Sequence, residues 1–191
     1  NILLGVCGSI SAYKSVDLAR SLQMKGHSVK VVLTKGAEQF LNKNIFKYLN
    51  IDVYSHNEDF EHKGVLHIDL ARWANTLAIC PLSANTLSKL ASASCDDLLT
   101  SIFLSLKKDV VKVVSPAMNV EMLQNELVQE NLKKIKCNII SSDEGLLACG
   151  EVGSGKLPNI QELAEIIPCF TNKKNKNKVV ITAGATLSNV D

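Results

Sequence analysis

The sequence of 191 residues has few aromatic side chains, no excess of one charge and no long hydrophobic run. Aromatic residues make up 5% of it, and 21 Lys and Arg residues against 19 Asp and Glu residues leave a net charge of +2. Binding to nucleic acid, by base stacking or through a basic surface, is therefore not expected. No apolar run approaches the roughly 18 residues that a membrane-spanning helix needs, so no membrane partner is expected either.

The sequence has no Cys-x-x-Cys pair, and its first residues do not have the pattern of a signal peptide. The N-terminus lacks the basic start and the small-residue cleavage site of a signal peptide, so we expect a cytoplasmic protein. In that compartment scattered cysteines are mostly small buried hydrophobic groups, and no metal site is expected. The six cysteines, none in a Cys-x-x-Cys pair, are Cys7, Cys80, Cys95, Cys137, Cys149 and Cys169.

Short aliphatic runs alternate with helical stretches along most of the chain. Strands are predicted over 2–7, 29–33, 76–80, 110–114 and 138–140, and helices over 12–25, 37–41, 83–91, 96–106 and 121–136. This alternation implies parallel pairing with right-handed crossovers, and continuous Val, Ile and Leu runs imply that both sheet faces are covered. We therefore predict an α/β, three-layer sandwich with an open, mainly parallel, Rossmann-like sheet.

The last third of the chain has a different composition. Residues 145–159 contain four glycines and are predicted to form a mobile loop. Residues 171–178 are polar and basic and are interpreted as a linker, and 179–191 begin a new strand and turn. The predicted organisation is a domain over 1–170, the linker, and the truncated start of a second domain.

Polar residues follow three of the predicted strands. Gly8-Ser9-Ile10-Ser11 offers backbone amides and two hydroxyls to an anion, although it is not a G-x-G-x-x-G fingerprint and similar turns often serve only as helix caps. Thr34 follows the second strand, and Ser83-Ala84-Asn85-Thr86 follows the strand over 76–80. Because parallel strands end at the same sheet edge, these groups are expected to form a cradle for a phosphate and a heteroaromatic ring.

Three further positions, His67, Asn119 and Cys149, are candidates for chemistry. His67, flanked by apolar residues and five positions before Arg72, offers a general acid or base near neutral pH, although a lone histidine is more often structural. Asn119 could cap a helix or orient a carboxylate through its amide. Cys149, in a glycine-rich segment, could be a proton donor, a nucleophile or an incidental thiol.

The motifs occur together and in a fixed order: Gly8-Ser-Ile-Ser-Ala-Tyr-Lys14, His67, Pro81-Leu-Ser-Ala-Asn-Thr86, Pro116-Ala-Met-Asn119 with Met122, and Ala148-Cys-Gly-Glu-Val-Gly-Ser-Gly155. The set resembles the homo-oligomeric flavin-containing cysteine decarboxylase family. Within that family it is most similar to the decarboxylase domain of bifunctional phosphopantothenoylcysteine decarboxylase/phosphopantothenate–cysteine ligases. The resemblance covers the whole chain. Gly184-Ala-Thr-Leu-Ser188 departs from the family's Gly-Pro-Thr-Arg-Glu, and no ligase activity is expected of this fragment.

The resemblance implies FMN as cofactor and a homotrimer with the flavin near the subunit interface; trimers of this family can assemble into dodecamers. It implies decarboxylation of 4′-phosphopantothenoylcysteine to 4′-phosphopantetheine in coenzyme A biosynthesis, made possible by a transient oxidation of the cysteine moiety. The FMN-binding residues it implies are Gly8, Ser9, Ile10, Ser11, Thr34, Ser83, Ala84, Asn85, Thr86 and Met118.

The resemblance also implies roles for the remaining positions. His67 acts in the oxidative step, and Asn119 holds the substrate carboxylate with Arg72 as its charged partner. Met122 shapes the pocket, and Cys149 protonates the intermediate during the reductive step.

Two other functions are compatible with parts of the pattern. A peptidyl-cysteine decarboxylase of the lantibiotic type shares the fold, the flavin and the His/Asn pair, but it has no need of the reducing cysteine at position 149. A flavin-binding regulatory subunit without turnover would have no need to retain His67, Asn119 and Cys149 together.

Overall fold

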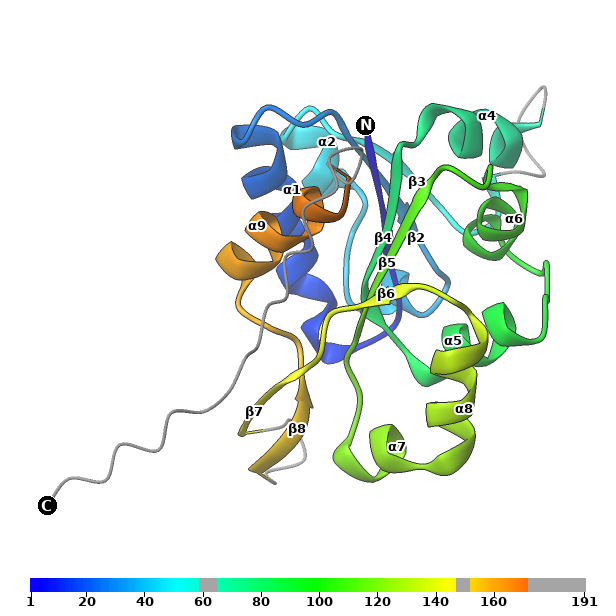
Figure 1. The fold of residues 1–191 in the computed structure, drawn as a ribbon. Helices are drawn as coiled ribbons and strands as arrows, with labels where there is room; N and C mark the ends of the chain where they lie inside the picture. Colours follow the sequence, from blue (N-terminus) through cyan, green and yellow to red (C-terminus); the bar gives the residue numbers. More distant parts are fainter. Residues whose placement is uncertain (59–64, 147–151, 172–191) are drawn as a thin grey trace, which may run out of the picture.

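The computed structural model describes residues 1–58, 65–146 and 152–171, and its centre is a six-stranded sheet. The strand order is β3-β2-β1-β4-β5-β6, and every neighbouring pair is parallel (Figure 1). The prediction of an open parallel sheet is confirmed. The strands are β1 (Ile2–Val6), β2 (Val29–Leu33), β3 (Asp52–Tyr54), β4 (Thr76–Leu82), β5 (Val111–Pro116) and β6 (Asn138–Ile139).

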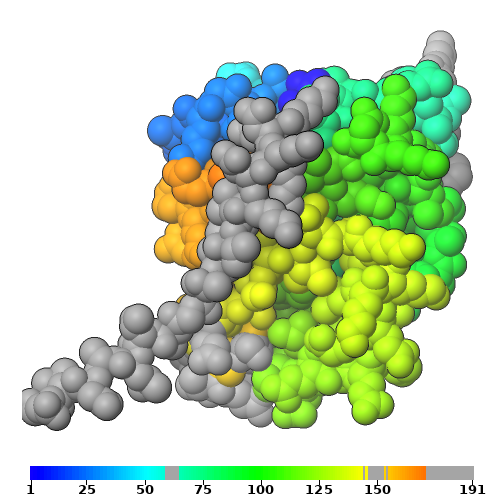
Figure 2. Space-filling view, viewed as in Figure 1, coloured from blue at the N-terminus to red at the C-terminus, as the bar shows by residue number. Residues whose placement is uncertain are grey.

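Helices cover both faces of this sheet. On one face pack α1 (Lys14–Met24), α2 (Asn44–Tyr48) and α9 (Ile160–Thr171). On the other pack α4 (Leu66–Trp73), α5 (Ala84–Ala91), α6 (Leu98–Ser105) and α8 (Glu126–Lys134). The orange atoms of α9 and the green atoms of α5 and α6 lie on opposite sides of the molecule (Figure 2). The predicted three-layer sandwich is therefore confirmed.

The central strand β1 shows why the sequence forms these layers. All five of its residues are buried, and alternate side chains enter opposite cores. Leu4 belongs to the core beneath α1 and α9, whereas Leu3 belongs to the core beneath α4 and α6. At Gly5 an added Cβ would lie 2.7 Å from Cδ1 of Leu99, so α6 packs directly on the strand where β1 has no side chain.

The chain reverses direction across the sheet at β1. From β1 it passes outward to β2 and β3, and then returns to place β4 on the other side of β1. In such sheets the loops at the carboxyl ends of the two central strands separate and leave a crevice. The turns of η1 (Ile10–Tyr13) and η2 (Ala37–Gln39) and the short helix α7 (Val120–Gln124) lie at this edge.

The predicted mobile loop over 145–159 is wrong in part. Strands β7 (Asp143–Leu146) and β8 (Val152–Lys156) form an antiparallel hairpin, in which Gly145 is paired with Gly153 (Figure 1). Glycine weakens a strand on its own, but here it leaves room for neighbouring side chains: an added Cβ would lie 3.1 Å from Lys156 Cδ at Gly145 and 3.3 Å from Val120 Cγ2 at Gly153. Residues 147–151 between the strands, and with them Cys149, lie outside the described residues.

The predicted helix over 121–136 is also wrong, because it is two helices. Asn125 ends α7 and begins α8, and its side-chain oxygen accepts a 3.0 Å hydrogen bond from the Leu127 amide. Elements α2, β3, α4 and α9 were not predicted from the sequence pattern. In the described part of the chain no helix combines the length and apolarity needed to cross a membrane. The predicted linker and second-domain start lie beyond residue 171.

Candidate active site

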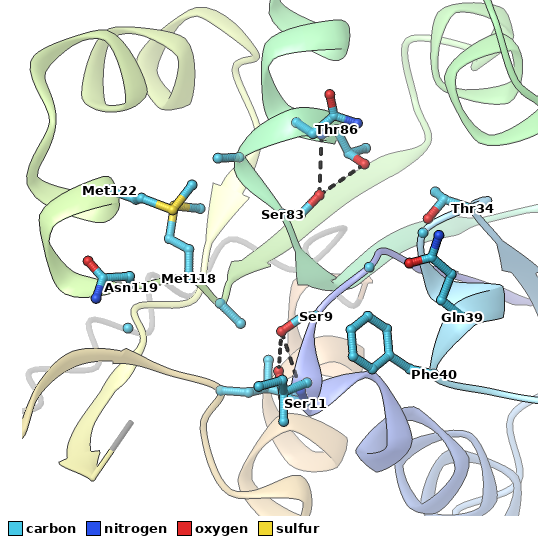
Figure 3. Close-up of a pocket in the computed structure, with 18 of the residues that line it drawn as sticks. Ser9, Ser11, Thr34, Gln39, Phe40, Ser83, Thr86, Met118, Asn119 and Met122 are labelled. Carbon is cyan, nitrogen blue, oxygen red and sulfur yellow. Dashed lines mark hydrogen bonds between the residues drawn. The ribbon is translucent and has the colours of Figure 1, made fainter. Parts of the chain in front are cut away.

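A cavity of about 940 Å³ opens at the carboxyl edge of the sheet (Figure 3). Its walls come from the segments after β1, β2, β4 and β5 and from the end of β8. This is the crevice expected for the fold, and its size falls within the roughly 300–1,000 Å³ typical of small-molecule sites. Twelve residues singled out from the sequence line it: Gly8, Ser9, Ile10, Ser11, Thr34, Ser83, Ala84, Asn85, Thr86, Met118, Asn119 and Met122.

The turn after β1 presents two hydroxyl groups to the cavity. Ser9 is the extended N-cap of η1; its Oγ accepts a 3.3 Å hydrogen bond from the Ser11 amide and lies 2.9 Å from Ser11 Oγ. A Cβ added at Gly8 would lie 2.9 Å from the Gly36 Cα, so the loops after β1 and β2 meet backbone to backbone. Hydroxyl and amide donors in such a turn suit a phosphate group.

The turn after β2 contributes residues that were not predicted from the sequence, among them Gln39 and Phe40. Thr34 Oγ1 accepts a 3.3 Å hydrogen bond from the Ala37 amide, and Gln39 and Phe40 follow it into the cavity wall (Figure 3). Phe40 is 48% exposed there. Thr34 was identified because residues that follow parallel strands lie at the same edge of the sheet. The same reasoning applies to the whole turn and could have identified Gln39 and Phe40.

Ser83 lies in the turn from β4 to α5 and begins that helix. Its Oγ accepts a hydrogen bond from the Thr86 amide and donates one to Thr86 Oγ1, both at 3.3 Å. Ser83 is therefore the N-cap of α5. Behind these residues lies the fully buried Cys7, and burial raises the pKa of its thiol to about 11. Cys7 is thus neutral and unreactive behind the cavity wall at physiological pH.

A buried carboxylate and a lysine, both missed from the sequence, complete this side. Asp97 caps α6 through a capping box with Thr100 and lies 3.7 Å from Lys89 Nζ. A 2.6 Å hydrogen bond with Asp96 raises the pKa of Lys89 and lowers that of Asp96. Lys89 is thereby held against the wall in its charged form.

The turn from β5 to α7 packs against the β7–β8 hairpin. Asn119 caps α7, accepting a 2.8 Å hydrogen bond from the Glu121 amide, so its predicted capping role is confirmed. The Met118 amide donates a 3.2 Å hydrogen bond to the Gly155 carbonyl oxygen. Figure 3 shows Asn119, Met118 and Met122 grouped on the wall across from Ser9 and Ser11.

His67 and Arg72 are not brought to this cavity. Both lie on α4, where His67 is half-buried and Arg72 is exposed. In Figure 1, α4 lies beside the start of β1, whereas α7 and the β7–β8 hairpin lie beyond the opposite end of the sheet. Within the described ranges, no three His, Cys, Asp or Glu side chains are arranged to hold a metal ion.

The residues present fit FMN. Among the described residues, four lysines and one carboxylate, that of Asp97, line the cavity, which suits an anionic ligand. The Ser9 and Ser11 hydroxyls supply donors for a phosphate. Ile10, Met118 and Met122 supply apolar surface for a ring system. The lysines are Lys14, Lys35, Lys89 and Lys156.

A model of the Flavoprotein family matches residues 1–172. The chain belongs to the Flavoprotein family. The resemblance found in the motifs is therefore confirmed. The chain is 40% identical over 172 residues to a probable phosphopantothenoylcysteine decarboxylase of Streptococcus mutans, with 87% of this chain and 96% of that protein covered.

Other relatives extend beyond this chain. It is 36% identical over 203 residues to the coenzyme A biosynthesis bifunctional protein CoaBC of Borreliella burgdorferi, matching along its whole length but covering 50% of that protein. The chain thus spans about half the length of that relative.

Two solved structures have the same fold. A mutant PPC decarboxylase complexed with pantothenoylaminoethenethiol superposes with a TM-score of 0.77 at 32% identity, covering 88% of this chain and 96% of that one. The FMN-binding protein AtHal3 superposes with a TM-score of 0.80 at 31% identity, covering 92% and 98%.

Proposed function

We propose that this chain is an FMN-dependent decarboxylase that converts 4′-phosphopantothenoylcysteine to 4′-phosphopantetheine in coenzyme A biosynthesis. The proposal rests on one observation. The fold brings Ser9, Ser83 and Asn119, which follow three different strands of the sheet, to the wall of one cavity. The 40% identity to a probable phosphopantothenoylcysteine decarboxylase supports this substrate over a peptide.

Bound FMN would supply reversible two-electron oxidation and reduction, the chemistry that allows an unactivated cysteine carboxylate to lose carbon dioxide. The chain's own residues bind and orient. Ser9 and Ser11 hold the cofactor phosphate with their hydroxyls. Asn119 accepts a hydrogen bond from the Glu121 amide through its side-chain oxygen, and its amide nitrogen is the donor type that a substrate carboxylate requires.

Proton transfer is assigned to His67 and Cys149. We propose that His67 acts in the cavity of a neighbouring subunit, because α4 lies away from the cavity of its own chain and the family resemblance implies a homotrimer with the flavin near the interface. Cys149 would protonate the intermediate in the reductive step. In the sequence Cys149 falls between β7 and β8, and β8 contributes Gly155 to the cavity.

The test is to purify the protein, record its flavin absorbance and measure carbon dioxide release from two substrates. We expect bound FMN and turnover of 4′-phosphopantothenoylcysteine, with no release from a peptide ending in cysteine. Turnover of the peptide alone would indicate the lantibiotic-type enzyme. Bound FMN without turnover of either would indicate a regulatory subunit, and failure to bind FMN would overturn the whole proposal.

A further inference from the structure

A second hollow adjoins the active-site cavity. It has a volume of about 540 Å³ and lies between the outer face of α1 and the start of α9. Lys14, the first residue of α1, lines both the hollow and the cavity. The connection from β8 to α9 does the same, since Lys156 and Leu157 line the cavity while Asn159 and Gln161 line the hollow. The two spaces are therefore neighbours along one groove.

The hollow is cationic and polar. Lys14 and Arg20 are its two cations and Asp17 is its one carboxylate. Among the described residues no carboxylate lies within 4.0 Å of Lys14 or Arg20, Asp17 included. The nearby Lys25, in contrast, is ion-paired with Glu165. Two cations that have no carboxylate partner in the described part of the chain, beside a polar hollow, suit a phosphate, which a guanidinium binds in bidentate fashion.

Helix geometry lets these two side chains reach one ligand. Lys14 and Arg20 are six residues apart, which corresponds to roughly 9 Å along the axis. At about 100° per residue, Lys14, Asp17, Arg20 and Ser21 fall within a third of the helix circumference. Both cationic side chains are long and flexible, so they can converge on a group held between their turns.

The proposed reaction needs a second anion site. Both FMN and the proposed substrate carry a phosphate, and the hydroxyls of Ser9 and Ser11 provide for one of them. The substrate is a peptide-like chain of three units, so its phosphate lies roughly 10–12 Å from its cysteine end. With that end at Asn119, the phosphate would be placed toward the part of the wall that Lys14 shares with the hollow.

We propose that the hollow lined by Lys14 and Arg20 binds the phosphate of the substrate and so selects phosphorylated over unphosphorylated pantothenoylcysteine. This inference rests on the proposed function. It makes Arg20 a specificity-determining residue for the substrate's far end, remote from the reacting carbon.

The experiment compares 4′-phosphopantothenoylcysteine with pantothenoylcysteine in the FMN-loaded protein. Arg20→Ala is expected to raise KM for the phosphorylated substrate about tenfold, as expected for losing one charge-assisted hydrogen bond. The kcat, the Kd for FMN and the KM for the unphosphorylated substrate should not change. Arg20→Lys should restore part of the affinity. Lys47→Ala, which removes an exposed lysine from α2, is the matched control and should have no effect.

Calorimetry with 4′-phosphopantothenate and pantothenate separates this inference from the proposed function. Loss of affinity for the phosphorylated ligand alone in Arg20→Ala supports the site even if no substrate turns over. Equal effects of Arg20→Ala on both ligands, or no effect on either, would overturn the site and leave the decarboxylase proposal standing.

Discussion

The carbonyl oxygen of Met118 lies 2.2 Å from the point that a Cβ would occupy at Gly155, which has a φ of +132°. Together with the hydrogen bond between the Met118 amide and the Gly155 carbonyl, this places the hairpin backbone directly on the wall that carries Asn119. No side chain fits between them. The contact connects the β7–β8 hairpin to the proposed carboxylate-binding residue.

Gly155→Ala should therefore displace the hairpin from the cavity. We expect a loss of about 1–3 kcal/mol in the free energy of unfolding, together with a large fall in carbon dioxide release. Gly26→Ala is the matched control, because Gly26 also has a positive φ, +84°, but an added Cβ there meets nothing within 4 Å. Urea unfolding and turnover should show a larger effect at Gly155 on both measures. Equal effects at the two glycines would contradict the proposed importance of the contact.

The sheet and most of the cavity could be predicted because they depend on local patterns. Buried strands such as β1 are marked by unbroken aliphatic residues, and in a parallel sheet whatever follows a strand lies at the same edge. That argument placed Ser9, Thr34 and Ser83 correctly. Asn125 is also a local signal, and it was missed only because helical periodicity continues on both sides of it.

The remainder depends on contacts between distant segments. The pairing of Gly145 with Gly153, and the approach of Gly155 to Met118, come from long-range packing that glycine permits but does not specify. Lys89 and Asp97 could not be assigned to the site from spacing, because their place on the wall follows from how α5 and α6 pack on the sheet. The location of His67 also depends on tertiary structure, and its proposed role depends on quaternary structure.

Asp97 has two roles: it caps α6, and it places a carboxylate in the cavity wall. Its Oδ1 accepts a 2.8 Å hydrogen bond from the Thr100 amide, and the residue is 8% exposed. Asp97→Ala should lower the free energy of unfolding by about 1–2 kcal/mol, since a helix cap is lost in a buried setting. Asp96→Ala removes a more exposed partner of Lys89 and should cost less than about 1 kcal/mol. Chemical denaturation of both variants checks this order; a larger loss for Asp96→Ala would refute it.

The buried thiol of Cys7 predicts a loss of stability in alkali. Burial raises the pKa of this thiol from its ordinary value of 9.0 to about 11 in the folded protein. Its stabilising contribution is therefore complete below pH 9 and is lost as the pH rises from 9 to 11, because the unfolded state releases its proton first. The loss is roughly 1 kcal/mol per pH unit over that window.

Cys7→Ala removes this titration. The difference in unfolding free energy between wild type and variant should therefore change by roughly 1 kcal/mol between pH 8 and pH 10. Cys95→Ala, at an exposed thiol, should show no such shift. Alkylation at pH 8 followed by mass spectrometry gives an independent check, in which Cys95 reacts and Cys7 does not. Rapid modification of Cys7 in the folded protein would rule out this account.

The proposed action of His67 across a subunit interface can be decided by mixing inactive chains. His67→Ala and Asn119→Ala should each abolish turnover. If His67 serves a neighbouring cavity, trimers assembled from equal amounts of the two variants contain cavities with an intact Asn119 from one chain and an intact His67 from the next. Random assembly places both in about a quarter of the cavities, so about a quarter of wild-type activity should return.

Mixtures of Asn119→Ala with the double variant His67→Ala/Asn119→Ala are the control, because none of their cavities has an intact Asn119. Carbon dioxide release after co-expression is the measurement, and flavin absorbance confirms that all mixtures are equally loaded. If His67 acts within its own chain, no mixture has a complete site, and the absence of recovered activity would exclude the interface assignment. Recovery would show that a complete active site requires two chains, which accounts for the distance between α4 and the cavity in a single subunit.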